Sequence, residues 1–203
     1  MQEQAITTSP AGIGECYDRV AMALHWSIAL LILLNVPLGL FSETIEAALG
    51  RSLMWVHKSI GLTVLALTIL RLLWRLSHRP PPLPSEISGW RARAAGLTHA
   101  GLYVLMIVVP LTGWMRSSAS GYPLRLFDLV EIPKFAIAPR SAAASAAATG
   151  HEVSAWAMLI LMAIHVAAAL HHHLVLRDAV LARMAPRVAR RSGTHRHGEA
   201  EEL

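Results

Sequence analysis

Four long apolar runs constrain this chain more than any other feature of its sequence. Each contains between 21 and 26 residues, and they cover residues 20–41, 53–74, 95–115 and 151–176. At a rise of about 1.5 Å per residue, a helix of that length crosses a hydrocarbon core of roughly 30 Å. Because backbone in lipid must satisfy its own hydrogen bonds, we expect each run to form a membrane-spanning helix.

The sequence therefore predicts an all-α fold, an integral membrane four-helix bundle. The chain is 54% hydrophobic with a mean hydropathy of +0.46, which is unusual for a soluble domain of 203 residues. We expect an N-terminal segment at 1–19, a transmembrane domain at 20–176 and a basic tail at 177–203. The first run is too long for a signal-peptide core and contains His25 and Pro37, so we interpret it as a retained span.

The connecting segments are less informative than the spans. The second loop, SHRPPPLPSEISG, is proline-rich and is expected to lie outside the bilayer. In the third loop, residues 117–150, the stretch GYPLRLFDLVEIPKF is expected along the outer interface, with Tyr122 and Phe127 at headgroup level. The stretch SAAASAAATG is of low complexity and predicts no particular structure, and the tail beyond Arg183 is expected to be disordered. No long internal repeat is evident.

The basic residues predict the orientation of the bundle. The N-terminus, the second loop and the tail hold twelve lysines and arginines, whereas the first and third loops with their flanks hold six. Such an excess marks the cytoplasmic side, so both termini are expected in the cytoplasm. Attraction of the basic tail to anionic lipid explains the net charge of +5, and no nucleic-acid partner is required.

Cysteine usage limits the cofactors that the chain can bind. Cys16 is the only cysteine, so no disulfide can form within the chain and no thiolate cluster can hold an iron–sulfur centre. There is also no C-x-x-C-H motif for covalent attachment of haem. Any metal cofactor is therefore expected to be bound by imidazole.

Histidines are the main titratable side chains within the spans. The carboxylates lie at the edges of the runs, as Asp18 and Glu152, and the basic Lys58 and Arg71 lie near helix ends. Ionisable residues inside a membrane are costly and mark functional sites by default. The histidines are therefore the first candidates for such a site.

Four of the histidines fall at two matched depths. His151 and His165 are fourteen residues apart, which places them about 21 Å apart along one helix and on nearly the same face. His57 lies near the outer end of the second span, and His25 lies near the inner end of the first. The spacing predicts an outer pair, His57 with His151, and an inner pair, His25 with His165. Two imidazoles at one depth are what a b-type haem needs as axial ligands.

Glycines in the same spans support this interpretation, because a macrocycle needs a flat and close approach to the backbone. The candidates are Gly39, Gly61, Gly101 and Gly113. Two alternatives remain open. A buried histidine is usually just hydrogen-bonded to a neighbouring helix, although four at matched depths weaken that interpretation. A zinc site or proton pathway usually combines imidazole with carboxylates, which the spans lack.

Each run also carries a distinctive segment. In chain order these are YDRVAMALHW, WVHKSIG, RLLWRL followed by PPPLP, GLTHAGLYVLMIVVPLTGW and HEVSAWAMLILMAIHVAAALHHHLVLRD. Over about residues 17–187 they resemble the bacterial cytochrome b561 family, most closely its dihaem inner-membrane members that oxidise superoxide. The resemblance implies two haem b groups with four axial ligands: His25, His57, His151 and His165. The chain departs from the family pattern in its histidine triplet at 171–173 and its alanine-rich third loop.

The resemblance also implies ubiquinone as the electron acceptor near the cytoplasmic side. Imidazoles can hydrogen-bond quinone oxygens and carry the protons that accompany reduction. Within the triplet the resemblance favours His172, with His99 facing it. The alternative is that these histidines reach toward the headgroups or contact haem propionates. Arg71 and Arg75 either neutralise propionates or anchor the second span.

Four basic residues occur on the outer side, against the usual bias: Arg51, Lys58, Arg116 and Lys134. One interpretation, above all for Lys58, is electrostatic steering of an anion such as superoxide toward the outer haem. The other interpretation is ordinary pairing with lipid phosphates and with nearby carboxylates, which are Glu43, Glu46, Asp128 and Glu131.

The sequence thus predicts an electron-transfer protein of the bacterial inner membrane. We expect a one-electron donor on the outer side, superoxide being oxidised to O2, two haems in between, and ubiquinone as acceptor. Axial ligation by two imidazoles leaves no open position on iron, which favours electron transfer over oxygen binding. Two rival classes are a cytochrome b carrier or anchor subunit of a dehydrogenase or hydrogenase, and a haem-free transporter or metal-binding bundle.

Overall fold

The computed structural model describes residues 17–50, 52–78, 81, 89–121, 123–178 and 180–184. Several expectations lie outside these residues. They concern the segment before Tyr17 with Cys16, most of the proline-rich second loop, the tail beyond residue 184, and the side chains of Arg51 and Tyr122.

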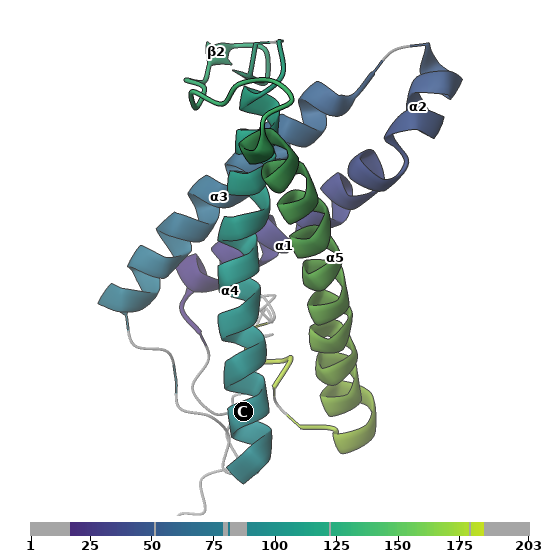
Figure 1. Ribbon diagram of the computed structural model, residues 1–203. Helices are drawn as coiled ribbons and strands as arrows, with labels where there is room; N and C mark the ends of the chain where they lie inside the picture. Colours follow the sequence, from purple (N-terminus) through teal and green to yellow (C-terminus); the bar gives the residue numbers. More distant parts are fainter. Residues whose placement is uncertain are drawn as a thin grey trace, which may run out of the picture.

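Four long helices make up most of the described chain, as Figure 1 shows: α1 (Arg19–Leu40), α3 (Met54–Ser77), α4 (Gly89–Ser118) and α5 (Ala142–His171). A single π-helical turn, η1 (His172–Leu176), continues α5. All four are long and apolar enough to cross a membrane. The expected all-α membrane four-helix architecture is confirmed.

The ends of the helices differ from the expected spans. Helix α4 begins at Gly89, and α5 begins at Ala142, nine residues before His151. The alanine-rich stretch is therefore the first part of α5, because alanine has the highest helix propensity and Ser141 caps the helix through a hydrogen bond from Ala144 N. A short helix, α2 (Ser42–Leu49), was not expected in the first loop, and it ends at Gly50 in the left-handed conformation.

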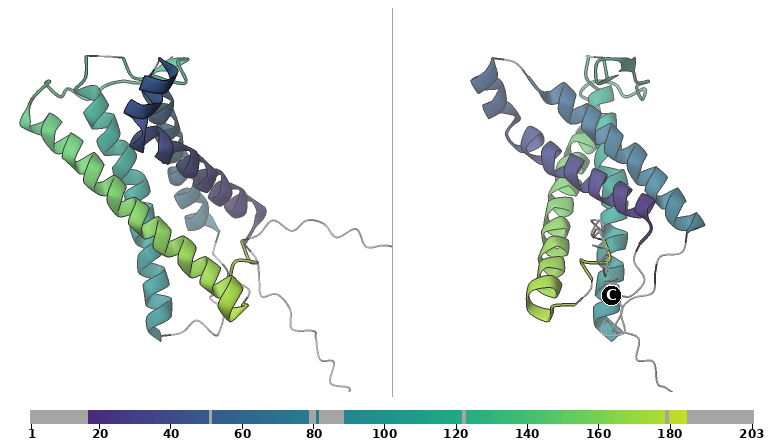
Figure 2. Two further views of the ribbon diagram at one scale, coloured as in Figure 1. Left: turned by 90° about the vertical axis from the view of Figure 1, so that its right-hand side faces the viewer. Right: turned by 180° about the vertical axis from the view of Figure 1, so that it is seen from behind.

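The helices pack in a series: α1 against α3, α3 against α4, and α4 against α5. The two antiparallel pairs, α1 with α3 and α4 with α5, cross obliquely (Figures 1 and 2). Within the described chain, α1 and α5 make no extended packing with each other. A buried cluster of Ile28, Ile32, Ile60, Val64 and Met106 joins the first three members of the series.

Both described ends of the chain lie at the same end of the bundle. Tyr17 N donates to Arg183 O at 3.3 Å, and the indole Nε1 of Trp26 donates to Met184 O at 2.7 Å. This agrees with an even number of crossings. We call this end the inner end and the opposite one, which carries α2, the outer end; assignment of the inner end to the cytoplasm rests on the basic residues alone.

Asp18 fastens the beginning of α1. Its Oδ1 accepts from Ala21 N at 2.8 Å and from Trp74 Nε1 of α3 at 3.1 Å. Slight burial raises the pKa of Asp18, but these hydrogen bonds outweigh it and hold the pKa below its ordinary value. The contribution of the carboxylate to stability is therefore present at neutral pH and is lost as the pH falls through that lowered pKa.

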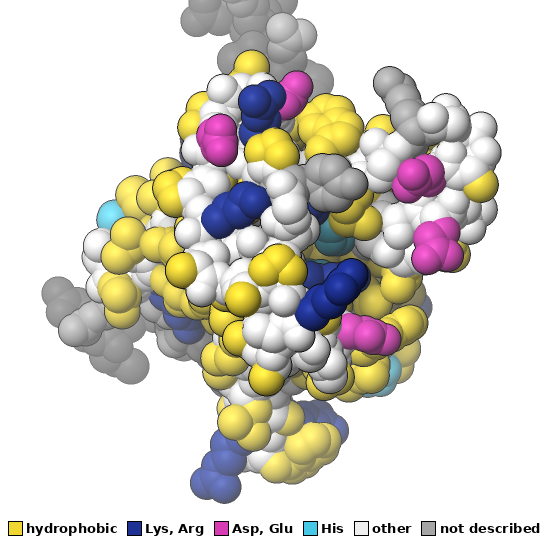
Figure 3. Space-filling model, turned by 45° about the horizontal axis from the view of Figure 1, so that its top comes forward, with side chains coloured by type: hydrophobic (Ala, Val, Ile, Leu, Met, Phe, Trp, Pro, Cys, Tyr) yellow, Lys and Arg dark blue, Asp and Glu magenta, His cyan; other side chains and the backbone are white. Residues whose placement is uncertain are grey.

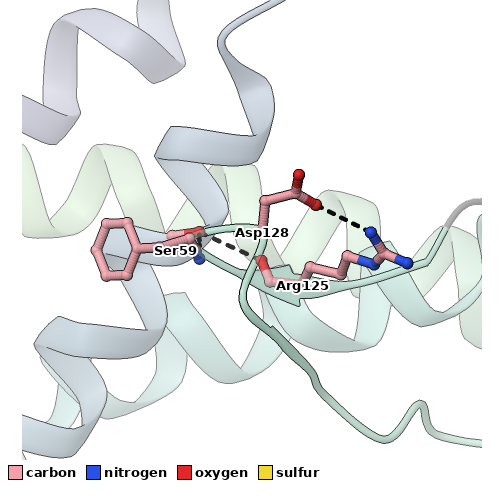
Figure 4. Close-up of polar contacts among 4 residues, drawn as sticks. Ser59, Arg125 and Asp128 are labelled. Carbon is pink, nitrogen blue, oxygen red and sulfur yellow. Dashed lines mark hydrogen bonds and ion pairs between the residues drawn. The ribbon is translucent and has the colours of Figure 1, made fainter.

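A small hairpin covers part of the outer end. Strands β1 (Arg125–Leu126) and β2 (Val130–Glu131) pair antiparallel across a turn in which Phe127 and Asp128 have positive φ. Figure 4 shows how Ser59 of α3, which is 0% exposed, holds this turn. Its Oγ accepts a hydrogen bond from Phe127 N at 2.9 Å. Its hydroxyl hydrogen is shared between two backbone oxygens, Trp55 O at 2.9 Å and Arg125 O at 3.3 Å.

Replacing Ser59 by alanine should loosen the hairpin. Phe127 N–H would lose its buried acceptor, which costs about 1–3 kcal/mol. Amide hydrogen exchange in detergent micelles should show faster exchange in the hairpin. Ser77→Ala is the matched control, because that hydroxyl bonds only Leu73 O of its own helix; equal effects of the two substitutions would contradict the assignment.

Candidate functional site

A cavity of about 460 Å³ opens in the outer half of the bundle. All four long helices line it, and both outer histidines, His57 and His151, are among the lining residues. Its volume lies in the range of cofactor and ligand sites. Among the described residues three buried side-chain polar atoms have no hydrogen-bond partner, and two of these, Asn35 Oδ1 and Ser117 Oγ, belong to lining residues.

The outer pair forms across this cavity as expected. His57 on α3 and His151 on α5 have ring centroids 6.3 Å apart, with an angle of 85° between the ring planes. Nδ1 of His57 lies 3.2 Å from Asn35 O, and Nδ1 of His151 lies 2.9 Å from Val109 O. Because a carbonyl only accepts, each Nδ1 carries the hydrogen and each Nε2 keeps a lone pair for a metal.

The inner pair is also brought together. His25 on α1 and His165 on α5 have ring centroids 6.4 Å apart, with an angle of 77° between their planes. The inner pair has a different polar surrounding, because Nη1 of Arg71 lies 2.8 Å from Nδ1 of His25. The guanidinium can only donate, so this contact puts the hydrogen of His25 on Nε2.

Both pairs have the separation that a bis-imidazole metal centre requires. Two metal–nitrogen bonds of about 2 Å, extended to the ring centres, span about 6 Å. The outer pair combines that separation with free Nε2 atoms and a cavity, so its residues fit a haem. The inner pair has the separation, but ligation through Nε2 of His25 requires Arg71 to release Nδ1. Within the described part of the chain, no three His, Cys, Asp or Glu side chains converge as a metal site.

Three of the four glycines accommodate side chains of neighbouring helices. A Cβ added at Gly39 would lie 2.8 Å from Cε1 of His57, and one at Gly113 would lie 3.0 Å from Cε1 of His151. At Gly101 the close atom is Cδ2 of Leu161, at 2.8 Å. At Gly61 the nearest atom is the Asn35 side-chain nitrogen, at 3.9 Å, which is ordinary contact.

Basic and acidic side chains are interspersed at the outer end of the molecule, as Figure 3 shows. The partly buried Lys58 and the exposed Arg116 line the cavity together with Glu152. Among the described residues the only ion pair between a basic side chain of the outer end and a carboxylate is the exposed Arg125–Asp128 contact at 3.1 Å. Within the described part of the chain, Lys58 therefore forms no ion pair with the nearby carboxylates, which was one of its two interpretations.

The two expected quinone histidines have different neighbours. His99, exposed on α4, has its ring centroid 5.3 Å from that of His165. His172 instead donates through Nδ1 to the carboxylate of Asp178, across the turn that ends α5. Asp178 was not among the expected site residues, although it ends the segment HHHLVLRD. A carboxylate that follows a histidine at the end of a helix is the sequence pattern that could have indicated this pair.

These features define the class of the protein as a membrane-embedded helical bundle with imidazole pairs across its interior, the arrangement of b-type cytochromes. The model of the family described as Prokaryotic cytochrome b561 matches residues 16–187. The chain belongs to this family. It is accordingly a bacterial membrane cytochrome that binds b-type haem and transfers electrons.

Named relatives agree with this membership. The chain is 33% identical over 173 residues to cytochrome b561 homolog 2 of Escherichia coli (strain K12), covering 84% of this chain and 91% of the relative. It is 30% identical over 177 residues to cytochrome b562 of Cereibacter sphaeroides, covering 83% and 94%. It is 28% identical over 179 residues to a Yersinia pestis protein named probable superoxide oxidase CybB, covering 84% and 96%.

Family membership predicts a coloured protein. The full chain, purified in mild detergent, should show the absorption bands of b-type haem, and these should sharpen on reduction by dithionite. A variant that lacks all four paired histidines should be colourless, because it has lost both imidazole pairs that could hold a haem between the helices. Haem that persists in that variant would contradict the histidine assignment.

Proposed function

We propose that the protein is a dihaem oxidoreductase that oxidises superoxide to O2 at the outer side and reduces ubiquinone near the inner side. Each superoxide gives up one electron, and the quinone takes up two electrons and two protons to become quinol. The observation that carries the proposal is the outer imidazole pair, whose Nδ1 atoms are bound to Asn35 O and Val109 O so that each Nε2 is left for iron.

Four histidines would supply the axial ligands. His57 and His151 would hold one haem at the outer level, and His25 and His165 would hold the other. The iron of each haem supplies the one-electron chemistry. At the inner level Arg71 has to leave Nδ1 of His25, and its guanidinium then becomes available to the propionates. With two histidines holding each iron, substrate would bind to the protein around the cavity and would not bind to the metal.

Replacing His151 or His165 by alanine should remove one haem and leave the other. Each substitution deletes one ligand of one pair, and the two levels lie about 21 Å apart along α5. The haem content per chain should fall by about half in either variant. His173→Ala, at an exposed position in η1, is the matched control. If both variants keep the full haem content, the proposed pairing is wrong.

Superoxide is an anion, and the described lining of the outer cavity has two cationic side chains and one carboxylate, which leaves it a net positive charge. Lys58 follows a proposed ligand directly in the chain, and Arg116 lies at the same cavity. Cationic side chains at the mouth of a low-dielectric cavity raise the local concentration of an anion and its rate of encounter. The relative named as a superoxide oxidase supports this choice of donor.

Lys58→Gln should slow superoxide consumption by the purified protein with added quinone, by roughly twofold to tenfold at low ionic strength. The salt dependence of the rate should also become flatter, because part of the attraction is gone. Arg125→Gln is the matched control: it removes one positive charge from the outer end, but at a paired and exposed site.

If the wild-type protein does not consume superoxide, superoxide is not its electron donor. The donor would then be a partner protein. The alternative of a carrier or anchor subunit would then account for the same fold and the same histidines.

For the quinone, the contacts favour His172 over His99. His172 is partly buried and bound to Asp178, and a histidine bonded to a carboxylate can pass a proton to a quinone oxygen. His99 lies beside the proposed inner ligand His165. We therefore place ubiquinone near the end of α5, on the side assigned to the cytoplasm by the basic residues, in the bacterial inner membrane.

A further inference from the structure

We propose that Gly39 and Gly113 are positioning residues, which seat the outer histidines against two helix carbonyls and thereby set the angle between the imidazole planes. This inference rests on the proposed function in one respect, namely that His57 and His151 are the outer haem ligands. It adds a role for two residues that act through the histidines.

The first step is the contact itself. At Gly39 an added Cβ would lie 2.8 Å from Cε1 and 3.3 Å from Nδ1 of His57. At Gly113 the corresponding distances to His151 are 3.0 and 3.1 Å. In both cases Nε2 is the more distant ring atom, at 3.7 and 3.8 Å. The same edge of each ring therefore rests on a glycine, and the metal-binding nitrogen lies away from it.

The second step is the relation between each glycine and the carbonyl that holds the ring. Asn35 O and Val109 O each lie four residues before the glycine in question. In an α-helix a residue at i+4 lies one turn above residue i on the same face, and its Cβ leans back toward the N-terminus. A side chain at i+4 therefore lies beside the approach to that carbonyl, and at these two positions glycine leaves room for the ring.

The third step is that the arrangement occurs twice in the chain. The segments VPLG at 36–39 and VPLTG at 109–113 end on the two glycines, and each lies in a helix that packs against the histidine-bearing helix that follows it. His25 precedes Gly39 by fourteen residues, and His99 precedes Gly113 by fourteen. The pair α1 with α3 thus corresponds to α4 with α5, and His57 corresponds to His151.

This short repeat explains why the outer pair is symmetric in its surroundings. Each glycine and the carbonyl four residues before it form one binding position for an imidazole ring, which we call a seat. One seat is on α1 and the other on α4, and they hold the two rings with 85° between their planes. A methyl group at position 39 would lie 2.8 Å from Cε1 of His57, closer than real Cβ contacts, and one at position 113 would lie 3.0 Å from Cε1 of His151, so each ring would have to shift away from the helix that holds it.

The test compares three alanine substitutions in the full chain, purified in detergent. Gly39→Ala and Gly113→Ala should each change the low-spin electron paramagnetic resonance signal of the outer haem, whose shape depends on the angle between the two ligand planes. Gly61→Ala adds a methyl group to the same cavity at ordinary contact distance, 3.9 Å from Asn35 Nδ2, and should leave that signal in place. If Gly61→Ala changes the signal equally, the proposal is wrong, and the glycines would instead leave room for the haem macrocycle.

A double-substitution cycle covers the case in which the glycine variants fold poorly. If the methyl group at position 39 harms the protein by striking the His57 ring, Gly39→Ala should cost no further thermal stability once His57→Ala is present. In a His151→Ala background the same substitution should keep its full cost, because the struck ring remains. Equal costs in both backgrounds would overturn the proposal.

The outcomes also separate this inference from the function on which it rests. A wild-type protein without haem, or a His57→Ala variant that keeps both haems, would contradict the proposed function whatever the glycine variants do. If the wild-type protein binds two haems and all three glycine variants behave alike, only the positioning role of Gly39 and Gly113 is contradicted.

Discussion

The hydrogen bond between an imidazole Nδ1 and a helix carbonyl is the interaction on which the outer site depends. A histidine inside an apolar bundle needs a partner for its polar hydrogen, and Asn35 O and Val109 O provide it from neighbouring helices. The bond satisfies a buried group and also decides which ring nitrogen remains available. One contact therefore serves both the stability of the bundle and the chemistry of the site.

Much of the fold could be predicted from the sequence, because lipid leaves few options for the backbone. The spans and the two pairings of His25, His57, His151 and His165 follow from apolar length and helical spacing, and the structure brings both pairs together. The alanine-rich beginning of α5 could not be separated from a loop by composition alone. The position of the hairpin likewise depends on a contact distant in sequence, since the buried hydroxyl of Ser59 accepts from a backbone N–H 68 residues away.

The details of the site were harder to predict because they depend on which side chain faces which backbone. The glycines stood out in the sequence, but a macrocycle and an imidazole ring both need a bare helix face, so the pattern could not choose between them. Likewise the spacing places Arg71 near the inner end without indicating that it would contact His25. The correspondence of VPLG with VPLTG is too short to find before the shared geometry is known.

The series of helix contacts has a consequence for how the protein is assembled. Since α1 and α5 make no extended packing along the described chain, while each contributes one histidine to the inner pair, a haem ligated there would join the first and last helices of the bundle. A cofactor bound only by the native form stabilises it by mass action. The amount of mature protein in the membrane should then follow the supply of haem in the cell as well as the rate of synthesis of the chain.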